Sequence, residues 1–228
     1  MNIKHGFTLP EILITLTIVG IVAAIAMPAL KGAKPNQEMI MLKKAYYLVS
    51  RTVGELINDE ELYPDNEDHP ELDGFANVSI QEQTGTEATY RNVSYGGNSP
   101  LYPSRLKFCG LFAARMNLVG SDRCSNITTF VGQNGRSVTG HFTTVDGMEW
   151  VMPITIFDTG MGIIQVDVNG NRKGFNCFEG NGCKEPDRFL IQVYKDGQIA
   201  VPPNGIERQY LSSQDNTRKY SEFINGRR

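Results

Sequence analysis

Apolar residues form an almost unbroken run from Ile12 to Leu30, with one charged side chain, Glu11, at its head. At about 1.5 Å per helical residue the run would be roughly 28 Å long, close to the thickness of a bilayer core. A carboxylate placed in the hydrocarbon core of a bilayer costs roughly 2.5–3.5 kcal/mol on insertion scales. No Lys or Arg lies between Phe7 and Leu30. We therefore expect a membrane-spanning helix whose Glu11 needs a chain terminus, another molecule or a proton as its partner.

The pattern changes from continuous to amphipathic after this run. From Gln37 to about Asn58, apolar side chains recur at three- and four-residue steps, which marks one face of a helix. The residues of that face are Met39, Leu42, Tyr46, Val49, Val53 and Leu56. This pattern predicts the lower half of a long N-terminal helix packed against a globular head.

Pro28 interrupts the apolar run near its end. A proline removes one helical hydrogen bond and clashes with the preceding turn, so it predicts a kink or a loosened turn. The alternative is that Pro28 ends the membrane-spanning part, which Gly32 and Pro35 also favour.

The rest of the chain alternates short β-prone runs with turn signals. Three Asx-Gly pairs, Asp146-Gly147, Asn169-Gly170 and Asp196-Gly197, fit the two-residue turns of hairpins. The clearest strand pairs are 142–145 with 148–151 and 191–195 with 198–201. We therefore expect an α+β protein with an antiparallel sheet in its head.

Length and charge limit the function. The 228 residues suffice for one ordinary domain plus the N-terminal segment, and the formal net charge is -3. No basic excess points to nucleic acid, so we expect no nucleic-acid partner.

All four cysteines, Cys109, Cys124, Cys177 and Cys183, follow the apolar segment. In an exported head an even number of cysteines indicates two disulfides, and four cysteines allow three pairings. We expect the local pairs, Cys109–Cys124 and Cys177–Cys183, the second of which would close a turn-rich loop. A zinc site is the alternative, but the sequence has neither Cys-x-x-Cys nor a paired His.

The stretch Gly6-Phe7-Thr8-Leu9-Pro10-Glu11 resembles the processing and methylation signature of type IV prepilins and of type II secretion pseudopilins. The resemblance implies cleavage between Gly6 and Phe7 by a prepilin peptidase and methylation of the new Phe7 amine. It also implies that Glu11 meets the N-terminal amine of a neighbouring subunit during filament assembly. The close likeness covers residues 6–30.

Two other interpretations of the N-terminus compete with this one. A secretory signal would have the basic start at Lys4 and a small-x-small cleavage site ending at Ala26, so that the mature chain would begin at Met27. Its apolar core, however, would be unusually long. A permanent single-pass anchor explains the length but gives Glu11 no role.

The head offers one candidate metal site. Oxygen-bearing side chains alternate at Asp167, Asn169 and Asn171, and such groups suit calcium. The match to a helix-loop-helix calcium loop fails at its sixth and twelfth positions, which are Arg172 and Phe178. Because some pseudopilins resembling this chain bind calcium in a C-terminal loop, we take Asp167, Asn169 and Asp187 as candidate ligands, and we expect no other cofactor.

The sequence thus predicts a leader over residues 1–6, a helix over 7–60 with 7–30 in the membrane, and a head over 61–228. The implied function is a structural subunit, not an enzyme, which is anchored in the bacterial inner membrane with its head in the periplasm. Its implied partners are membrane lipid, the prepilin peptidase, an inner-membrane assembly platform and other pilins of a type IV pilus or pseudopilus filament. The alternatives are a membrane-anchored or tip-located binding module, which would be a minor pilin, and a tethered secreted enzyme.

Overall fold

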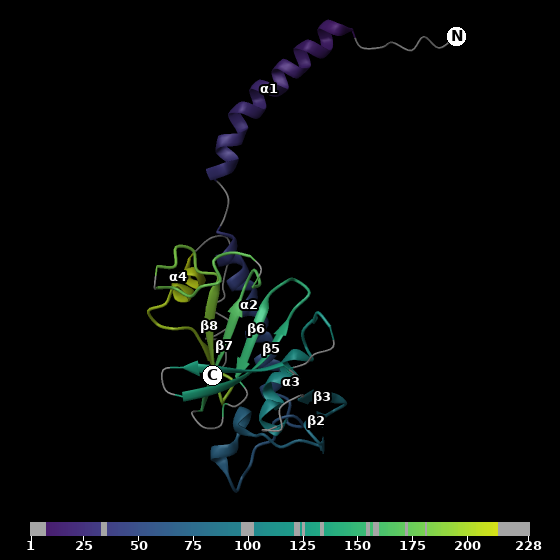
Figure 1. The fold of residues 1–228 in the computed structure, drawn as a ribbon, viewed down its shortest axis with the longest axis vertical. Coiled ribbons are helices and arrows are strands. Elements are labelled where there is room, and N and C mark those ends of the chain that lie inside the picture. Colours follow the sequence, from purple (N-terminus) through teal and green to yellow (C-terminus); the bar gives the residue numbers. More distant parts are fainter. Residues whose placement is uncertain are drawn as a thin grey trace, which may run out of the picture. The chain divides into compact units, whose positions relative to one another are not determined.

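The computed structural model describes two compact units, Met1–Gln37 and Glu38–Arg228. Within them it describes residues 8–32, 36–96, 103–120, 124, 126–132, 135–153, 156, 160–171, 173–180 and 182–213 (Figure 1).

The first unit contains one helix, α1 (Leu9–Gly32). Between Leu9 and Ile25 its ten large apolar side chains are 47–78% exposed. Apolar residues lie on every side of the helix, so no polar face distinguishes one direction from another. In the described part of the chain, no helix meets the combined length and hydropathy required of a membrane span.

The stretch expected as one helix over residues 7–60 contains two helices. The second, α2 (Gln37–Ile57), begins after Asn36, which is not helical. Gly32 and Pro35 stand in this part of the sequence, and both residues disfavour a continuous helix.

Helix α2 supplies one wall of the core of the second unit. All six residues of its predicted apolar face are buried. Five of them, all but Met39, join a single hydrophobic cluster with residues of the sheet and of a short helix, α3 (Lys107–Ala113). The amphipathic prediction is confirmed. At about 25 cal/mol per Å² of apolar surface, burying this face is the main contribution of α2 to stability.

A six-stranded antiparallel sheet forms the opposite wall. Its strands follow one another in chain order: β4 (Asn126–Gly132), β5 (Gly135–Thr143), β6 (Glu149–Pro153), β7 (Met161–Asp167), β8 (Arg188–Tyr194) and β9 (Ile199–Ala200). Alternate residues point to opposite faces. Trp150, Val166 and Phe189 therefore lie in the core, whereas Glu149, Asp167 and Arg188 lie on the other face.

Smaller elements complete the second unit. A three-stranded sheet consists of β1 (Glu82–Thr84), β2 (Glu87–Tyr90) and β3 (Val93–Gly96), and the last of these contacts α3. Short 3-10 turns, η1 (Pro70–Leu72), η2 (Gly74–Ala76) and η3 (Pro103–Leu106), and the helix α4 (Ile206–Ser212) make up the rest. The α+β fold with antiparallel sheets is as the sequence predicts.

Two of the predicted hairpins are present, but their registers are shifted by one residue. Thr143 faces Glu149, and Val193 faces Ile199, so both loops are longer than the expected two residues. In each loop the glycine has a positive φ, 87° at Gly147 and 83° at Gly197. This is the three-residue loop that combines a type I turn with a left-handed glycine.

The third predicted turn does not close a hairpin. Asn169-Gly170 begins the long connection from β7 to β8. That connection joins Asp167 to Arg188, which face each other in the sheet, and it carries one of the disulfides.

Candidate functional site

The N-terminal motif begins before the described residues. Gly6 and Phe7, and with them the predicted cleavage and methylation, lie outside the part of the chain that the structure describes. The description starts at Thr8, and it shows how Glu11 is held.

Glu11 has a partner in its own helix. Its Oε2 accepts hydrogen bonds from the backbone N–H and from the hydroxyl of Thr8, both at 2.8 Å. This is half of a capping box, in which a carboxylate in the first turn satisfies a free N–H at the helix start. The expectation that only a terminus, another molecule or a proton could partner Glu11 is therefore wrong.

The sequence signal for this cap is the spacing Thr8-x-x-Glu11, which is the known capping-box pattern. Sequence reasoning missed it because Glu11 was considered only as a charge in a membrane. Both hydrogen bonds use Oε2, and among the described residues Oε1 accepts no hydrogen bond. Within residues 8–32, one carboxylate oxygen is therefore left for a second partner.

Pro28 lies inside α1, which continues to Gly32. The helix therefore does not end at Pro28. The kink proposed there stays a prediction.

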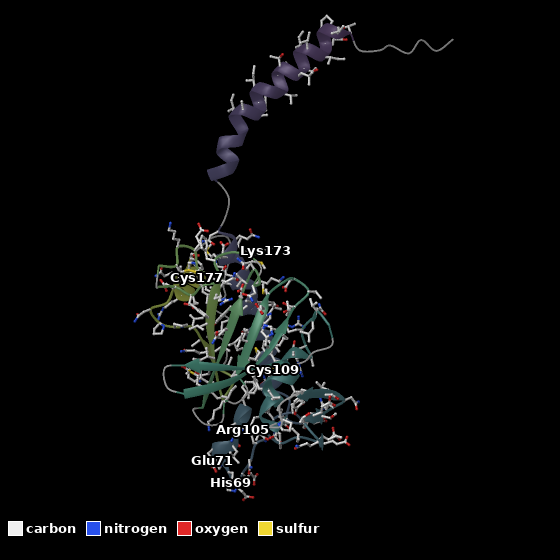
Figure 2. The ribbon with its side chains drawn as sticks, in the orientation of Figure 1. His69, Glu71, Arg105, Cys109, Lys173 and Cys177 are labelled. Carbon is white, nitrogen blue, oxygen red and sulfur yellow. A yellow bond between two sulfur atoms is a disulfide. The ribbon has the colours of Figure 1, made fainter. Side chains whose placement is uncertain are left out.

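Both local disulfides are present in the head (Figure 2). Cys109 on α3 joins Cys124, and both residues are fully buried in the core cluster. Cys177 joins Cys183 within the connection from β7 to β8 and closes a short surface loop. These are the two pairings that the sequence analysis favours.

The three candidate calcium ligands are near one another, and one of them, Asp187, already accepts hydrogen bonds from the protein. Asp187 is 1% exposed, and its oxygens accept the N–H groups of Asn176 and Cys177, both at 2.9 Å, and the amide of Asn169 at 3.3 Å. This carboxylate anchors the β7–β8 connection. Within the described ranges, no group of three His, Cys, Asp or Glu side chains could hold a metal ion.

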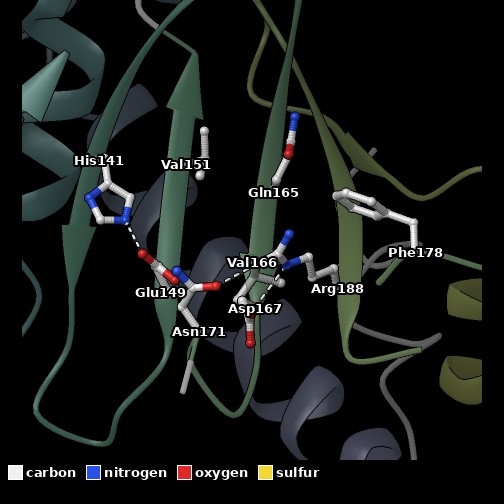
Figure 3. A pocket seen from close by; sticks show the side chains of 9 residues that line it. All are labelled: His141, Glu149, Val151, Gln165, Val166, Asp167, Asn171, Phe178 and Arg188. Atoms are coloured by element: carbon white, nitrogen blue, oxygen red, sulfur yellow. Dashed lines mark hydrogen bonds and ion pairs between the residues drawn. The ribbon is translucent and has the colours of Figure 1, made fainter. Parts of the chain in front are cut away.

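A pocket of about 280 Å³ lies on the outward face of the large sheet (Figure 3). Three charged residues form a row across it, because Glu149 on β6 faces Asp167 on β7, which faces Arg188 on β8. Arg188 Nε donates to Asp167 Oδ2 at 3.0 Å, and its Nη2 donates to the side-chain oxygen of Asn171 at 2.9 Å. On the other side of the row, His141 Nε2 lies 2.5 Å from Glu149 Oε1.

Asp167 is the most deeply buried charge of this row, at 5% exposure. Burial raises the pKa of its carboxyl, Arg188 opposes that rise, and the nearby Asp187 adds to it. Among the described residues, Asp167 Oδ1 is buried and has no hydrogen bond of standard geometry. The backbone N–H of Asn169 nevertheless lowers the pKa of the Asp167 carboxyl, as the smallest of these effects. None of these pocket contacts was predicted, since they join residues far apart in the sequence.

A second buried charge, Lys107, lies on α3. It is 1% exposed, and its Nζ is 4.5 Å from the centre of the Tyr63 ring and 5.0 Å from that of Tyr90. Within the described residues, Nζ and the hydroxyls of Tyr63 and Tyr95 have no hydrogen-bond partner. Burial lowers the pKa of Lys107 from 10.5 to about 8.

The architecture defines a class before any comparison: an apolar N-terminal helix followed by a disulfide-linked α+β head with antiparallel sheets, which is a pilin-like arrangement. Comparison with protein families then identifies a prokaryotic N-terminal methylation motif over residues 1–27. This motif marks the type IV prepilin and pseudopilin family. No curated protein and no solved structure matches the chain.

Proposed function

We propose that this chain is the precursor of a structural subunit of a type IV pilus or of a type II secretion pseudopilus. The observation that supports this proposal is the methylation motif over residues 1–27, with Gly6, Phe7 and Glu11 in their expected places. A prepilin peptidase cleaves after Gly6 and methylates the Phe7 amine. The mature subunit then joins a helical filament with other pilins.

The apolar surface of α1 fits both stages of this pathway. Its large side chains between Leu9 and Ile25 are exposed on all sides, and apolar surface of that extent needs lipid or protein to cover it. In the precursor the cover is the lipid of the inner membrane, with the head in the periplasm. In the filament it is the equivalent helices of neighbouring subunits, delivered through an assembly platform in the inner membrane.

Glu11 has two tasks in this proposal. Its Oε2 caps α1 through Thr8, and its Oε1 receives the Phe7 amine of a neighbouring subunit. A charge-assisted hydrogen bond is roughly twice as strong as a neutral one, and it gains further where water is excluded. The pair would therefore fix the axial position of each new subunit.

Intact-mass analysis of the membrane-extracted protein tests the processing step. The expected mature chain begins at N-methylated Phe7. Gly6→Val should block cleavage and leave the leader attached, whereas Gly20→Ala, a change with nothing within 4 Å of the added carbon, should be processed normally. A chain that begins at Met27 would show ordinary secretion instead.

Glu11→Gln separates the two tasks of the carboxylate. Glutamine also completes a capping box, so the variant keeps the helix start but loses the charge. We expect normal cleavage and methylation with little or no filament in sheared-surface fractions. Filament yield equal to that of the unmodified chain would refute the pairing with the Phe7 amine, and Thr8→Val serves as a control that changes only the cap.

A second, weaker candidate function is calcium binding at Asp167, Asn169 and Asp187. It is supported by two buried oxygens, Asp167 Oδ1 and Asn169 Oδ1, for which the described residues provide no hydrogen bond of standard geometry. Calcium would have to rely partly on amide oxygens, because N–H donors already occupy Asp187. A rise in melting temperature with CaCl₂ but not with MgCl₂, absent in Asn169→Leu, is the expected result. Equal melting temperatures in both salts would refute it.

A further inference from the structure

The pocket on the outward face of the large sheet is assembled from three separate parts of the chain. Strands β5 and β6 supply His141 and Glu149, the end of β7 supplies Asp167, and the connection to β8 supplies Phe178 (Figure 3). Its volume of about 280 Å³ is just below the usual 300–1,000 Å³ of drug-sized ligand sites. It therefore suits a ligand the size of one small ring.

The pocket presents charged groups of both signs in one row, which restricts the ligand. An anion would meet Glu149 and Asp167, and a cation would meet Arg188 in the same row. A purely apolar ligand would displace the water that hydrogen-bonds to these groups and would offer no hydrogen bond in its place, which costs free energy for each group left unpaired. A neutral ligand with several hydroxyl groups avoids the repulsion that an anion or a cation would meet and the lost hydrogen bonds of an apolar ligand, because each hydroxyl both donates and accepts.

The pocket also has an aromatic edge. Phe178 is 37% exposed, and it follows Cys177, whose disulfide closes the loop. The backbone of Cys177 is tied to the sheet, because its N–H donates to Asp187 Oδ1 at 2.9 Å and its carbonyl accepts the N–H of Arg188 at 3.2 Å. An exposed phenylalanine is thus held at the rim of a polar cavity, where it offers a flat apolar surface at little cost in entropy.

We propose that this pocket binds one pyranose ring of a carbohydrate. The apolar face of the ring lies on Phe178, and its hydroxyls exchange hydrogen bonds with Glu149, Gln165 and Arg188. This binding goes beyond the proposed structural function. It also does not depend on that function, because every contact belongs to the head.

Saturation-transfer difference NMR on the full chain tests the proposal. The chain is kept in a detergent without a sugar head group, such as lauryldimethylamine oxide, since a glycosidic detergent would compete for the pocket. The probes are the methyl glycosides of glucose, galactose, mannose and N-acetylglucosamine. We expect transfer to the ring protons of at least one probe, with a millimolar dissociation constant.

Matched variants locate the binding. Phe178→Ala should weaken it at least tenfold, whereas Phe175→Ala, at a phenylalanine that is 57% exposed in the same connection and does not line the pocket, should leave it unchanged. Glu149→Gln should weaken binding without loss of fold, as judged by the fluorescence of the buried Trp150. Absence of transfer to all four probes overturns the proposal, and so does equal transfer in Phe178→Ala.

Discussion

The buried lysine Lys107 allows a quantitative test of the head. It has no hydrogen-bond partner among the described residues, and two tyrosine rings provide its nearest favourable contacts. Burial lowers the pKa of Lys107 from 10.5 to about 8. At 1.36 kcal/mol per pH unit, the charged side chain costs the folded state about 3 kcal/mol at pH 7. Lys107→Met, which keeps the length of the side chain and removes the charge, should recover much of this free energy.

The sign of the pH dependence follows from proton binding. Between about pH 8 and pH 10.5 the unfolded chain holds the lysine proton and the folded chain does not, so stability rises with pH. From pH 7 to pH 9.5 the free energy of unfolding should rise by about 2 kcal/mol. The range stops there because tyrosines of the unfolded chain ionise near pH 10. In Lys107→Met this rise should be absent.

Denaturant unfolding of the detergent-solubilised chain measures both effects. Trp150 is the only tryptophan of the sequence and is fully buried, so its fluorescence reports loss of the core. Lys173→Met, at an exposed lysine, is the matched control and should keep the pH dependence of the unmodified chain. If stability is flat from pH 7 to pH 9.5 in the unmodified chain, or if Lys107→Met lowers stability at pH 7, the reasoning is refuted.

Two further predictions use the same unfolding assay. Gly110→Ala should destabilise the head by about 1–3 kcal/mol, because the added carbon would overlap the Tyr95 side chain, whereas Gly54→Ala on α2, with nothing within 4 Å, should stabilise it by up to about 1 kcal/mol. Equal effects of the two changes would contradict the packing of α3 on β3. Arg188→Met should cost about 3 kcal/mol at pH 7, because it leaves the Asp167 carboxylate buried and unpaired. Burial already raises the pKa of Asp167, and the pKa rises further without Arg188. The loss of stability in Arg188→Met should therefore shrink as the pH falls toward 4, because the Asp167 carboxylate becomes protonated. A loss of stability that is independent of pH would exclude Asp167 as its cause.

Local patterns allowed some of these features to be predicted. The apolar face of α2 follows from a period of about 3.6 residues, and all six of its residues are buried. The disulfides were expected because each pair is close in sequence, 15 residues apart for Cys109–Cys124 and 6 for Cys177–Cys183. In both cases the signal and the contact lie within a short stretch of chain.

Hairpin turns show where local reasoning is less exact. Asp146-Gly147 and Asp196-Gly197 are in three-residue loops, so every strand partner differs by one from the expected register. A two-residue turn occurs instead at Arg91-Asn92, where both residues have positive φ, 48° and 65°. No glycine marks it. The conformation of this turn is therefore imposed by the pairing of β2 with β3, and not by the intrinsic conformational preference of its two residues.

The pocket could not be predicted for a different reason. His141, Asp167 and Arg188 are brought together by the order of four strands, and no spacing in the sequence records that order. The type of Asp187 and its neighbours in the sequence predict a metal ligand. In the structure its oxygens bind backbone N–H groups, a role that any buried carboxylate can have and that only the fold reveals.

The two N-terminal helices differ in how much apolar surface they leave for assembly. The apolar face of α2 is used within the head, because Leu42, Val49 and Leu56 are fully buried there. The described side chains of α1 leave their apolar surface exposed in every direction. In the proposed filament, contacts between subunits would therefore fall mainly on α1, where a change such as Ile18→Ser would disturb assembly while the head stays intact. A change such as Val49→Ser would unfold the head first, because it places a polar group in the core.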